Sequence, residues 1–279
     1  MMNPWLGMGL VLAIFGGLMV GLQAYRRRRS PHPELTRKLL HVGMGLVALT
    51  LPWLFAQAWP VLVLVGVTVI ILTAVKRSAT LQGHLGGVID GVARESLGEI
   101  YFPLAVGLVF LLSRGHASLF CIPILILTLA DTVAALIGMR YGRLRYATVE
   151  GSKSIEGSFA FFAVAFLSTH IPLLLFTDSG PAKTLLIAMT LALLVMLLEA
   201  IAWRGLDNLL VPLGAFALLR AYLAMDVATL TVQLGVMISL TILAMFWRRR
   251  AIFTDSKLLG DQNSPVFDLH ADHGKAYSD

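Results

Sequence analysis

Long apolar runs alternate with short polar segments along most of the chain. A transmembrane helix needs about 20 mainly apolar residues, and most of these runs approach or exceed that length. The pattern predicts an all-α, polytopic bundle of about nine transmembrane helices. The predicted runs are Pro4–Ala24, Leu39–Ala56, Ala58–Val75, Ile100–Leu112, Ala117–Ile137, Ile155–Phe176, Thr184–Trp203, Leu209–Met225 and Val227–Trp247.

The run Ile100–Leu112 is too short to cross about 30 Å of hydrocarbon at about 1.5 Å per residue. Its helix must therefore begin earlier, near Ser96, or be broken. Either arrangement draws Glu99 toward the membrane.

The composition agrees with a membrane protein. Of the 279 residues, 57% are hydrophobic and 14% are charged, whereas soluble domains carry about 25% charged residues. The mean hydropathy is +0.80. We predict a single transmembrane catalytic domain over residues 1–250, with its motifs between residues 37 and 212, and a flexible cytoplasmic tail over residues 251–279. The single cysteine, Cys121, excludes a disulfide framework and a cysteine-based metal site.

The basic residues define an orientation. Cytoplasmic loops of membrane proteins are enriched in Lys and Arg. If every run crosses the membrane, 19 of the 22 basic residues fall on one side. That side is predicted to be the cytoplasm, which puts the N-terminus outside and the C-terminus inside. The segments assigned to the cytoplasm are 25–38, 76–99, 138–154, 203–208 and 248–279.

The net charge of +6 is then an orientation signal and a contact surface for lipid headgroups, not a nucleic-acid-binding face. Arg26–Arg29 follow the first apolar run instead of preceding it, so this run is predicted to be an anchor and not a cleaved signal peptide. The start of the chain lacks the Arg- and Ser-rich composition of a transit peptide, which favours the bacterial cytoplasmic membrane.

Ionisable residues within a bilayer are costly and mark function. Arg37, Lys38 and His41 lie at the start of the second run, with Arg37 and His41 on one helical face. Lys38 could be an interfacial anchor whose ammonium reaches the headgroups. His41 needs a polar partner and is a candidate proton acceptor or phosphate contact.

A second polar cluster precedes the short fourth run. Asp90 and Arg94 can pair at i, i+4 on a helix, while Glu95 and Glu99 repel unless a cation or a proton lies between them. Either a solvated amphipathic stretch or part of a site fits this pattern, so Arg94 and Glu99 are kept as candidates.

The third cluster is the most informative. Asp131 lies well inside an apolar run, where a carboxylate is either paired with a base or holds a metal. The following loop is basic and ends at a predicted helix N-terminus, whose free N–H groups and dipole favour phosphate. A carboxylate for Mg²⁺ beside cations for phosphates is what phosphoryl transfer requires. This loop contains Arg143, Ser152, Lys153, Ser154 and Glu156.

The fourth cluster combines Glu199 at the end of one helix with Asp207 and Asn208 at the start of the next. Asp207 is either a helix N-cap or a second oxygen ligand for the metal, because Mg²⁺ is commonly held by one or two carboxylates plus substrate phosphates. Asp131 and Asp207 fall on the same side in the predicted topology.

Taken in order, these motifs resemble the phytol kinase and dolichol kinase family, which includes CTP-dependent diacylglycerol kinases. The resemblance extends from about Arg37 to Pro212. It rests on Arg37-Lys38-x-x-His41, on Arg94 to Glu99 with Tyr101-Phe102-Pro103, on Ala130-Asp131-x-x-Ala134 with Gly138, on Lys153-Ser154-x-Glu156-Gly157-Ser158, and on Glu199 with Gly205-x-Asp207-Asn208 and Pro212.

The resemblance implies transfer of the γ-phosphate of CTP to the hydroxyl of a membrane lipid, with Mg²⁺. The expected roles are a metal site at Asp131, with Asp207 or Asn208; phosphate contacts from Arg37, Lys38, Arg143, Ser152, Lys153 and Ser154; and a base among His41, Glu99 and Glu156. Arg94 and Glu199 are further candidates. The expected partners are a lipid alcohol and a nucleoside triphosphate, with a homodimer left open and no nucleic acid.

Two alternatives remain at this point. A phosphatidate cytidylyltransferase would make a CDP-lipid, but the second Asp of that family's Gly–Gly–x–x–Asp–Arg–x–Asp stretch is missing after Asp207. An ion-coupled transporter or flippase would use Asp131 and Glu199 as a pathway. The absence of an inverted repeat, and the clustering of polar groups at one face, speak against it.

Overall fold

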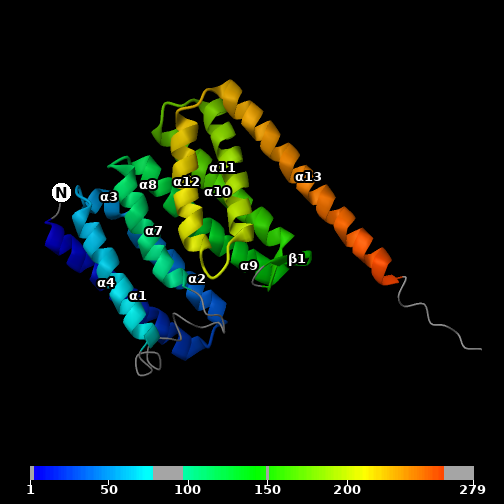
Figure 1. Ribbon diagram of the computed structural model, residues 1–279. Coiled ribbons are helices and arrows are strands. Elements are labelled where there is room, and N and C mark those ends of the chain that lie inside the picture. The colour runs from blue at the N-terminus through cyan, green and yellow to red at the C-terminus, as the bar shows by residue number, and fades with distance from the viewer. Residues whose placement is uncertain (1–2, 78–96, 149–150, 261–279) are drawn as a thin grey trace, which may run out of the picture. The chain divides into compact units, whose positions relative to one another are not determined.

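The computed structural model describes residues 3–77, 97–148 and 151–260 (Figure 1). Within this part of the chain the protein is helical apart from one hairpin, which confirms the all-α prediction. Every predicted apolar run coincides with a helix or with adjoining helices. The described helices are α1 (Pro4–Arg29), α2 (Pro33–Leu49), α3 (Leu51–Leu54), α4 (Trp59–Arg77), α7 (Gly98–Ser113), α8 (Ala117–Leu125), η2 (Ile126–Ala130), α9 (Asp131–Tyr141), α10 (Ile155–Phe176), α11 (Pro181–Ile201), α12 (Asp207–Leu223) and α13 (Val227–Gly260).

Several of these helices have the length and composition of membrane spans. Among the described residues, five helices are long and apolar enough to cross a membrane, and α7 and the segment Val227–Leu243 are shorter apolar helices. Together they identify an integral membrane protein. The five are Pro4–Arg29, Trp59–Arg77, Ala117–Tyr141, Ile155–Phe176 and Pro181–Ile201.

The structure defines the ends of three predicted helices more closely than the sequence did. The second run is broken between α2 and α3, because Pro52 has no backbone N–H to donate to the carbonyl one turn earlier. Helix α7 begins at Gly98, which confirms that the short fourth run starts earlier than its apolar part. Helix α13 continues past residue 250 to Gly260, so the first part of the predicted tail is helical.

A hairpin replaces the predicted loop between α9 and α10. Strands β1 (Arg145–Thr148) and β2 (Gly151–Ser154) pair antiparallel, with Arg145 opposite Ser154. The N–H of Ile155 donates to the Leu144 carbonyl at 2.8 Å and extends this pairing to the start of α10. Because both strands are only four residues long and mostly polar, they lack the alternating pattern by which strands are recognised.

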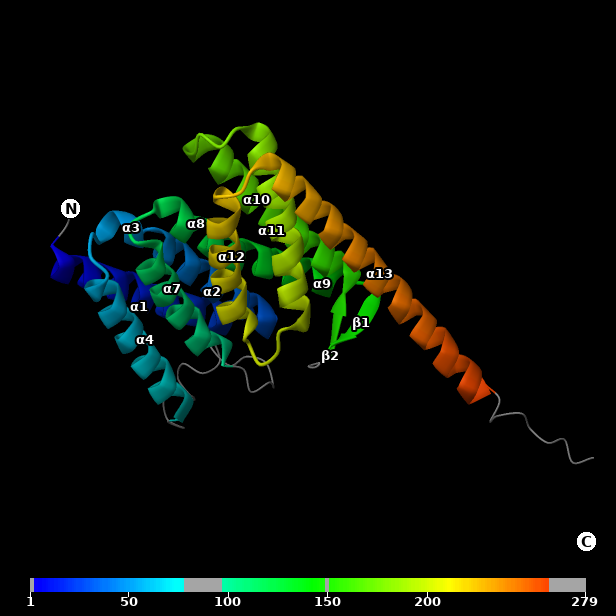
Figure 2. The same cartoon turned by 45° about the horizontal axis from the view of Figure 1, so that its top comes forward.

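Two compact units are distinguished, Met1–Leu234 and Gly235–Asp279. In the first unit, α10 packs on α11 and α9, and α12 packs on α11 and α7 (Figures 1 and 2). The core of these contacts is apolar and fully buried, with Phe161 from α10, Leu191 from α11 and Tyr222 from α12. This core holds the helix ends that border the candidate site.

Helices α8, η2 and α9 follow one another without a break, and η2 is a single π-helical turn. Helix α2 lies against this turn at Gly45, where an added Cβ would collide with the side chain of Thr128. The glycine therefore permits the close approach that brings the start of α2 to Asp131, the first residue of α9.

Candidate active site

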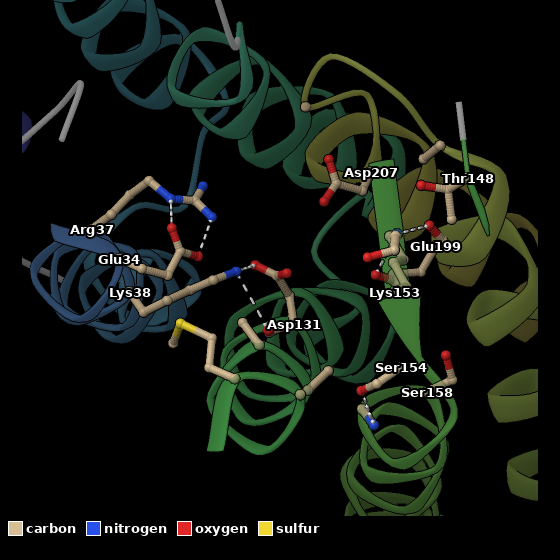
Figure 3. Close-up of a pocket in the computed structure, with 18 of the residues that line it drawn as sticks. Glu34, Arg37, Lys38, Asp131, Thr148, Lys153, Ser154, Ser158, Glu199 and Asp207 are labelled. Atoms are coloured by element: carbon tan, nitrogen blue, oxygen red, sulfur yellow. Dashed lines mark hydrogen bonds and ion pairs between the residues drawn. The ribbon is translucent and has the colours of Figure 1, made fainter. Parts of the chain in front are cut away.

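A polar cavity of about 700 Å³ lies where the ends of several helices meet the hairpin (Figure 3). Its walls come from the first turns of α2, α7, α10 and α12, from α9, from both strands, and from the end of α11 with the turn that follows it. Ten predicted site residues line it: Arg37, Lys38, Glu99, Asp131, Ser152, Lys153, Ser154, Glu199, Asp207 and Asn208. Segments as far apart as residues 37 and 208 thus share one cavity.

The four remaining candidates are not among these lining residues. His41, Arg143 and Glu156 belong to the described residues but do not line the cavity. Arg94, with Asp90 and Glu95 of the same predicted cluster, lies outside the described residues.

Lys38 and Asp131 form an ion pair between α2 and α9. The Lys38 Nζ donates to Asp131 Oδ2 at 2.7 Å and to the Asp131 carbonyl at 3.4 Å. Their side chains are 4% and 13% exposed, so the pair is buried. Lys38 is therefore not the interfacial anchor that its sequence position also allowed. The sequence offered no signal for this pairing, because the two residues are 93 positions apart.

His41 lies behind this pair. Its Nε2 donates to the Leu127 carbonyl of the π turn at 3.0 Å and lies 3.5 Å from Asp131 Oδ2. The imidazole ring also contacts Phe102 of α7 edge-on, with 5.0 Å between ring centroids. His41 thus has the polar partners that a buried histidine needs, and it joins α2, η2 and α7.

Lys153 and Glu199 make a second ion pair on the other side of the cavity (Figure 3). The Lys153 Nζ lies 2.6 Å from Glu199 Oε1 and also donates to the Glu199 backbone carbonyl. This contact fastens β2 to the end of α11. The side chain of Lys153 keeps 29% exposure, so it faces the open cavity more than Lys38 does.

Arg37 pairs with Glu34, a cavity residue that sequence reasoning did not single out. The guanidinium donates from Nη2 to Oε1 at 2.6 Å and from Nε to Oε2 at 3.0 Å. Their i, i+3 spacing in the first turn of α2 was a usable signal, since such pairs face each other on a helix.

Glu99 and Asn208 connect α7 with its neighbours at the cavity wall. Glu99 Oε2 accepts from Lys76 of α4 at 2.9 Å, which supplies the cation that the sequence required beside this carboxylate. Asn208 Nδ2 donates to the Gly98 carbonyl at 3.0 Å, while its buried Oδ1 has no hydrogen-bond partner among the described residues. An acceptor oxygen is therefore left over beside Asp207.

Asp207 precedes the apolar part of α12 and lines the cavity. Burial raises the pKa of its carboxyl, and the negative charge of Asp131 raises it further. Both carboxyl groups border one cavity, where their like charges repel. No cluster of three or more His, Cys, Asp or Glu side chains suited to a metal occurs among the described residues. Mg²⁺ needs fewer, because phosphates and water complete its coordination.

The hairpin is held by side chains that the sequence placed in the site. Glu156 Oε1 accepts the backbone N–H groups of Arg143 and Leu144 at 3.0 and 3.2 Å. Ser154 caps α10 by accepting the N–H of Gly157 at 3.1 Å. Arg145 also lines the cavity, and its Nη1 donates to Ser152 Oγ at 3.3 Å.

Fold and site together define an integral membrane protein with a polar cavity at the ends of its helices. Acidic and basic side chains both line this cavity, which suits it to group transfer. Over 213 residues the chain is 31% identical to the phytol kinase of Synechocystis sp., an alignment that covers 76% of this chain and 89% of that protein. The chain therefore belongs to the phytol kinase family, and it is a lipid kinase, a phosphotransferase that acts on an alcohol. No family model and no solved structure matches it.

Proposed function

We propose that this lipid kinase transfers the γ-phosphate of CTP to the hydroxyl of a membrane lipid alcohol, with Mg²⁺, in the polar cavity. Phytol, a polyprenol and diacylglycerol are the alcohols to be tested. The main support for this proposal is that three distant parts of the chain bring the carboxylates of Asp131 and Asp207 and the ammonium of Lys153 into one cavity. Family membership favours this function over nucleotidyl transfer and transport.

The metal site is proposed at Asp131, Asp207 and Asn208. The mutual repulsion of the two carboxyl groups and the unpartnered Oδ1 of Asn208 suit a hard divalent cation with oxygen ligands. When bound, Mg²⁺ would neutralise the phosphate charge and hold the γ-phosphate in line for attack. Lys38 neutralises the charge of Asp131 by forming an ion pair with it. When the nucleotide binds, the Lys38 ammonium would contact the phosphates.

Phosphate contacts are proposed from the hairpin and from α2. Lys153 and Ser152 face the cavity from β2, Ser154 lies at the start of α10, and Arg37 lies opposite on α2. Arg143 offers only its backbone N–H to Glu156 and does not line the cavity. We therefore assign to Arg145, which does line it, the role that the sequence gave to Arg143.

The base that takes the hydroxyl proton is proposed to be His41 or Glu99. Glu99 has the better position, because it lines the cavity beside Lys76, whereas His41 lies outside the cavity and its Nε2 carries the proton that it donates to Leu127. The geometry gives less support to Glu156, because two backbone N–H groups occupy its Oε1 outside the cavity. Phosphoryl transfer depends mainly on positioning and charge neutralisation, so loss of the base should cost less than loss of Asp131.

The active site is proposed to face the cytoplasm of a bacterial cell, with the N-terminus outside and the C-terminus inside. The cavity is lined by the starts of α2, α7, α10 and α12 and by the end of α11. In the predicted topology all of these lie on the cytoplasmic side, which is also the side of the basic residues.

A phosphoryl-transfer assay tests the function. The purified chain in lipid nanodiscs receives γ-labelled CTP or ATP, Mg²⁺ and the three alcohols. We expect label in a lipid phosphate, and its loss in Asp131→Asn. Asp226→Asn is the matched control, because it removes an exposed carboxylate that does not line the cavity. Pyrophosphate release with phosphatidic acid, without label transfer, would indicate the cytidylyltransferase instead.

A further inference from the structure

A second hollow, here called the apolar groove, lies among α1, α2, α4 and α7. Its volume is about 80 Å³, and of its lining residues only Thr68 has a polar side chain. Phe15 lines it from α1, Met44 and Val47 from α2, and Val106 from α7. An empty apolar hollow between helices forfeits packing contacts, so its presence needs a reason.

The apolar groove lies further along two of the helices that line the polar cavity. On α7, Glu99 lines the polar cavity, whereas Phe102 and Val106 line the groove. These residues follow at i, i+3 and i+7 and so share one face. At about 1.5 Å per residue, Phe102 lies about 4.5 Å beyond Glu99 and Val106 about 10 Å beyond it.

Helix α2 repeats this order. Arg37 lines the polar cavity, and Met44 and Ala48 line the apolar groove, followed by Leu51 of α3. His41 comes between them on the same face, at i+4 from Arg37. Both helices thus lead from charged side chains to apolar ones in the same direction.

His41 and Phe102 mark the junction. The histidine Nε2 is 3.5 Å from the Asp131 carboxylate, and its ring contacts the Phe102 ring, which lines the groove. A lipid alcohol with its hydroxyl near Asp131 would have the first carbons of its chain beside these two side chains.

We propose that the apolar groove is the binding subsite for the hydrocarbon segment next to the hydroxyl of the lipid substrate. This inference rests on the proposed function and adds a place for the chain of the acceptor. A groove of about 80 Å³ holds only a few carbon atoms, so the rest of a long chain stays in the bilayer. The fitting ligand is a flexible or branched aliphatic alcohol.

The groove acts by positioning. Bilayer hydrocarbon is as apolar as the groove, so transfer of the chain gains little hydrophobic free energy. Fixing the first carbons instead fixes the direction of the hydroxyl, and a misplacement of about 1 Å can cost about 100-fold in rate. Filling the groove should therefore lower kcat/KM for the alcohol by at least about tenfold and leave the KM for CTP unchanged.

Two matched pairs of variants test this. Val47→Phe and Val65→Phe each enlarge a half-buried groove residue, on α2 and α4 respectively. Leu46→Phe and Val63→Phe place the same ring on the same helices at side chains that are 54% and 45% exposed. Full-length variants in nanodiscs are assayed at varied alcohol mole fraction. Only the groove variants should lose kcat/KM, and equal losses in all four, or none, overturn the proposal.

A second measurement uses the unmodified chain. A long-chain alcohol with a photoactivatable diazirine near its hydroxyl is irradiated with the protein, and the labelled peptides are identified by mass spectrometry. Labels on α2 and α7 around Met44 and Phe102, displaced by unlabelled alcohol, support the groove. Labels that persist under competition indicate surrounding bilayer lipid only and refute it. Absence of phosphoryl transfer by the unmodified chain would instead refute the proposed function.

Discussion

The ion pair between Lys38 and Asp131 can be tested by removing its members singly and together. The pair spans 2.7 Å, and its side chains are 4% and 13% exposed. Removing one member of a buried ion pair leaves an uncompensated charge and costs about 3–5 kcal/mol, whereas replacing both is close to neutral. Lys38→Met and Asp131→Asn should each destabilise the protein by this amount, and the double variant should recover most of the loss.

The expected change in thermal stability is large. For proteins of about this size each kcal/mol shifts Tm by about 2–4 °C, so each single variant should lose about 6–20 °C. The assay is thermal unfolding in detergent with a thiol-reactive fluorophore. Cys121 is the single cysteine of the chain and is only partly exposed, so it reports unfolding from one known place.

The control pair is Glu34 and Arg37, which is more exposed at 16% and 30%. Pairs at i, i+3 on a helix contribute only about 0.2–0.5 kcal/mol, so Glu34→Gln and Arg37→Met should change Tm little. Purely additive losses in the Lys38 and Asp131 double variant would refute the pairing. Restored stability without restored activity is expected, because Asp131 is also the proposed metal ligand.

Three further predictions concern separate parts of the molecule. Asp207→Asn should raise the Mg²⁺ concentration for half-maximal activity at least about tenfold, while Asp226→Asn leaves it unchanged; equal Mg²⁺ curves would remove Asp207 from the metal site. Gly142→Ala should lower both Tm and activity, because its Cβ would meet the Gly138 carbonyl, whereas Gly66→Ala, with open space around it, should do neither. The N–H of Thr229 donates to Asp226 at 2.7 Å and lowers the pKa of that carboxyl. The Tm difference between wild type and Asp226→Ala should therefore be full above about pH 4 and disappear at lower pH; a difference that persists in acid would contradict it.

The helices could be predicted because apolar length is a local property. Each run of about 20 apolar residues must become a helix in a bilayer, whatever it packs against. Helix ends were harder, as α13 shows by reaching Gly260, since they depend on caps and neighbours. The hairpin at Arg145–Ser154 was not predicted, because it has no hydrophobic pattern that a sequence would show. It is stabilised by backbone pairing and by the Glu156 carboxylate.

The candidate site could be predicted as a set of residues but not as a set of contacts. Asp131, Lys153 and Asp207 stood out because charged groups are rare beside apolar runs. The sequence could not reveal that Lys38 faces Asp131, or that Lys153 faces Glu199, because each pair joins distant helices. A local cue existed only for Glu34, at helical spacing from Arg37.

The π turn at Ile126–Ala130 has a consequence for how the site can be lost. A π turn holds one residue more than an α turn, and each residue of a helix advances the side-chain direction by about 100°. Deletion of a single codon in this turn would restore regular winding and rotate Asp131 out of line with α8. Apolar substitutions there would leave the winding intact. The direction of the Asp131 carboxylate therefore depends on the number of residues in the π turn, and not on which side chains those residues carry.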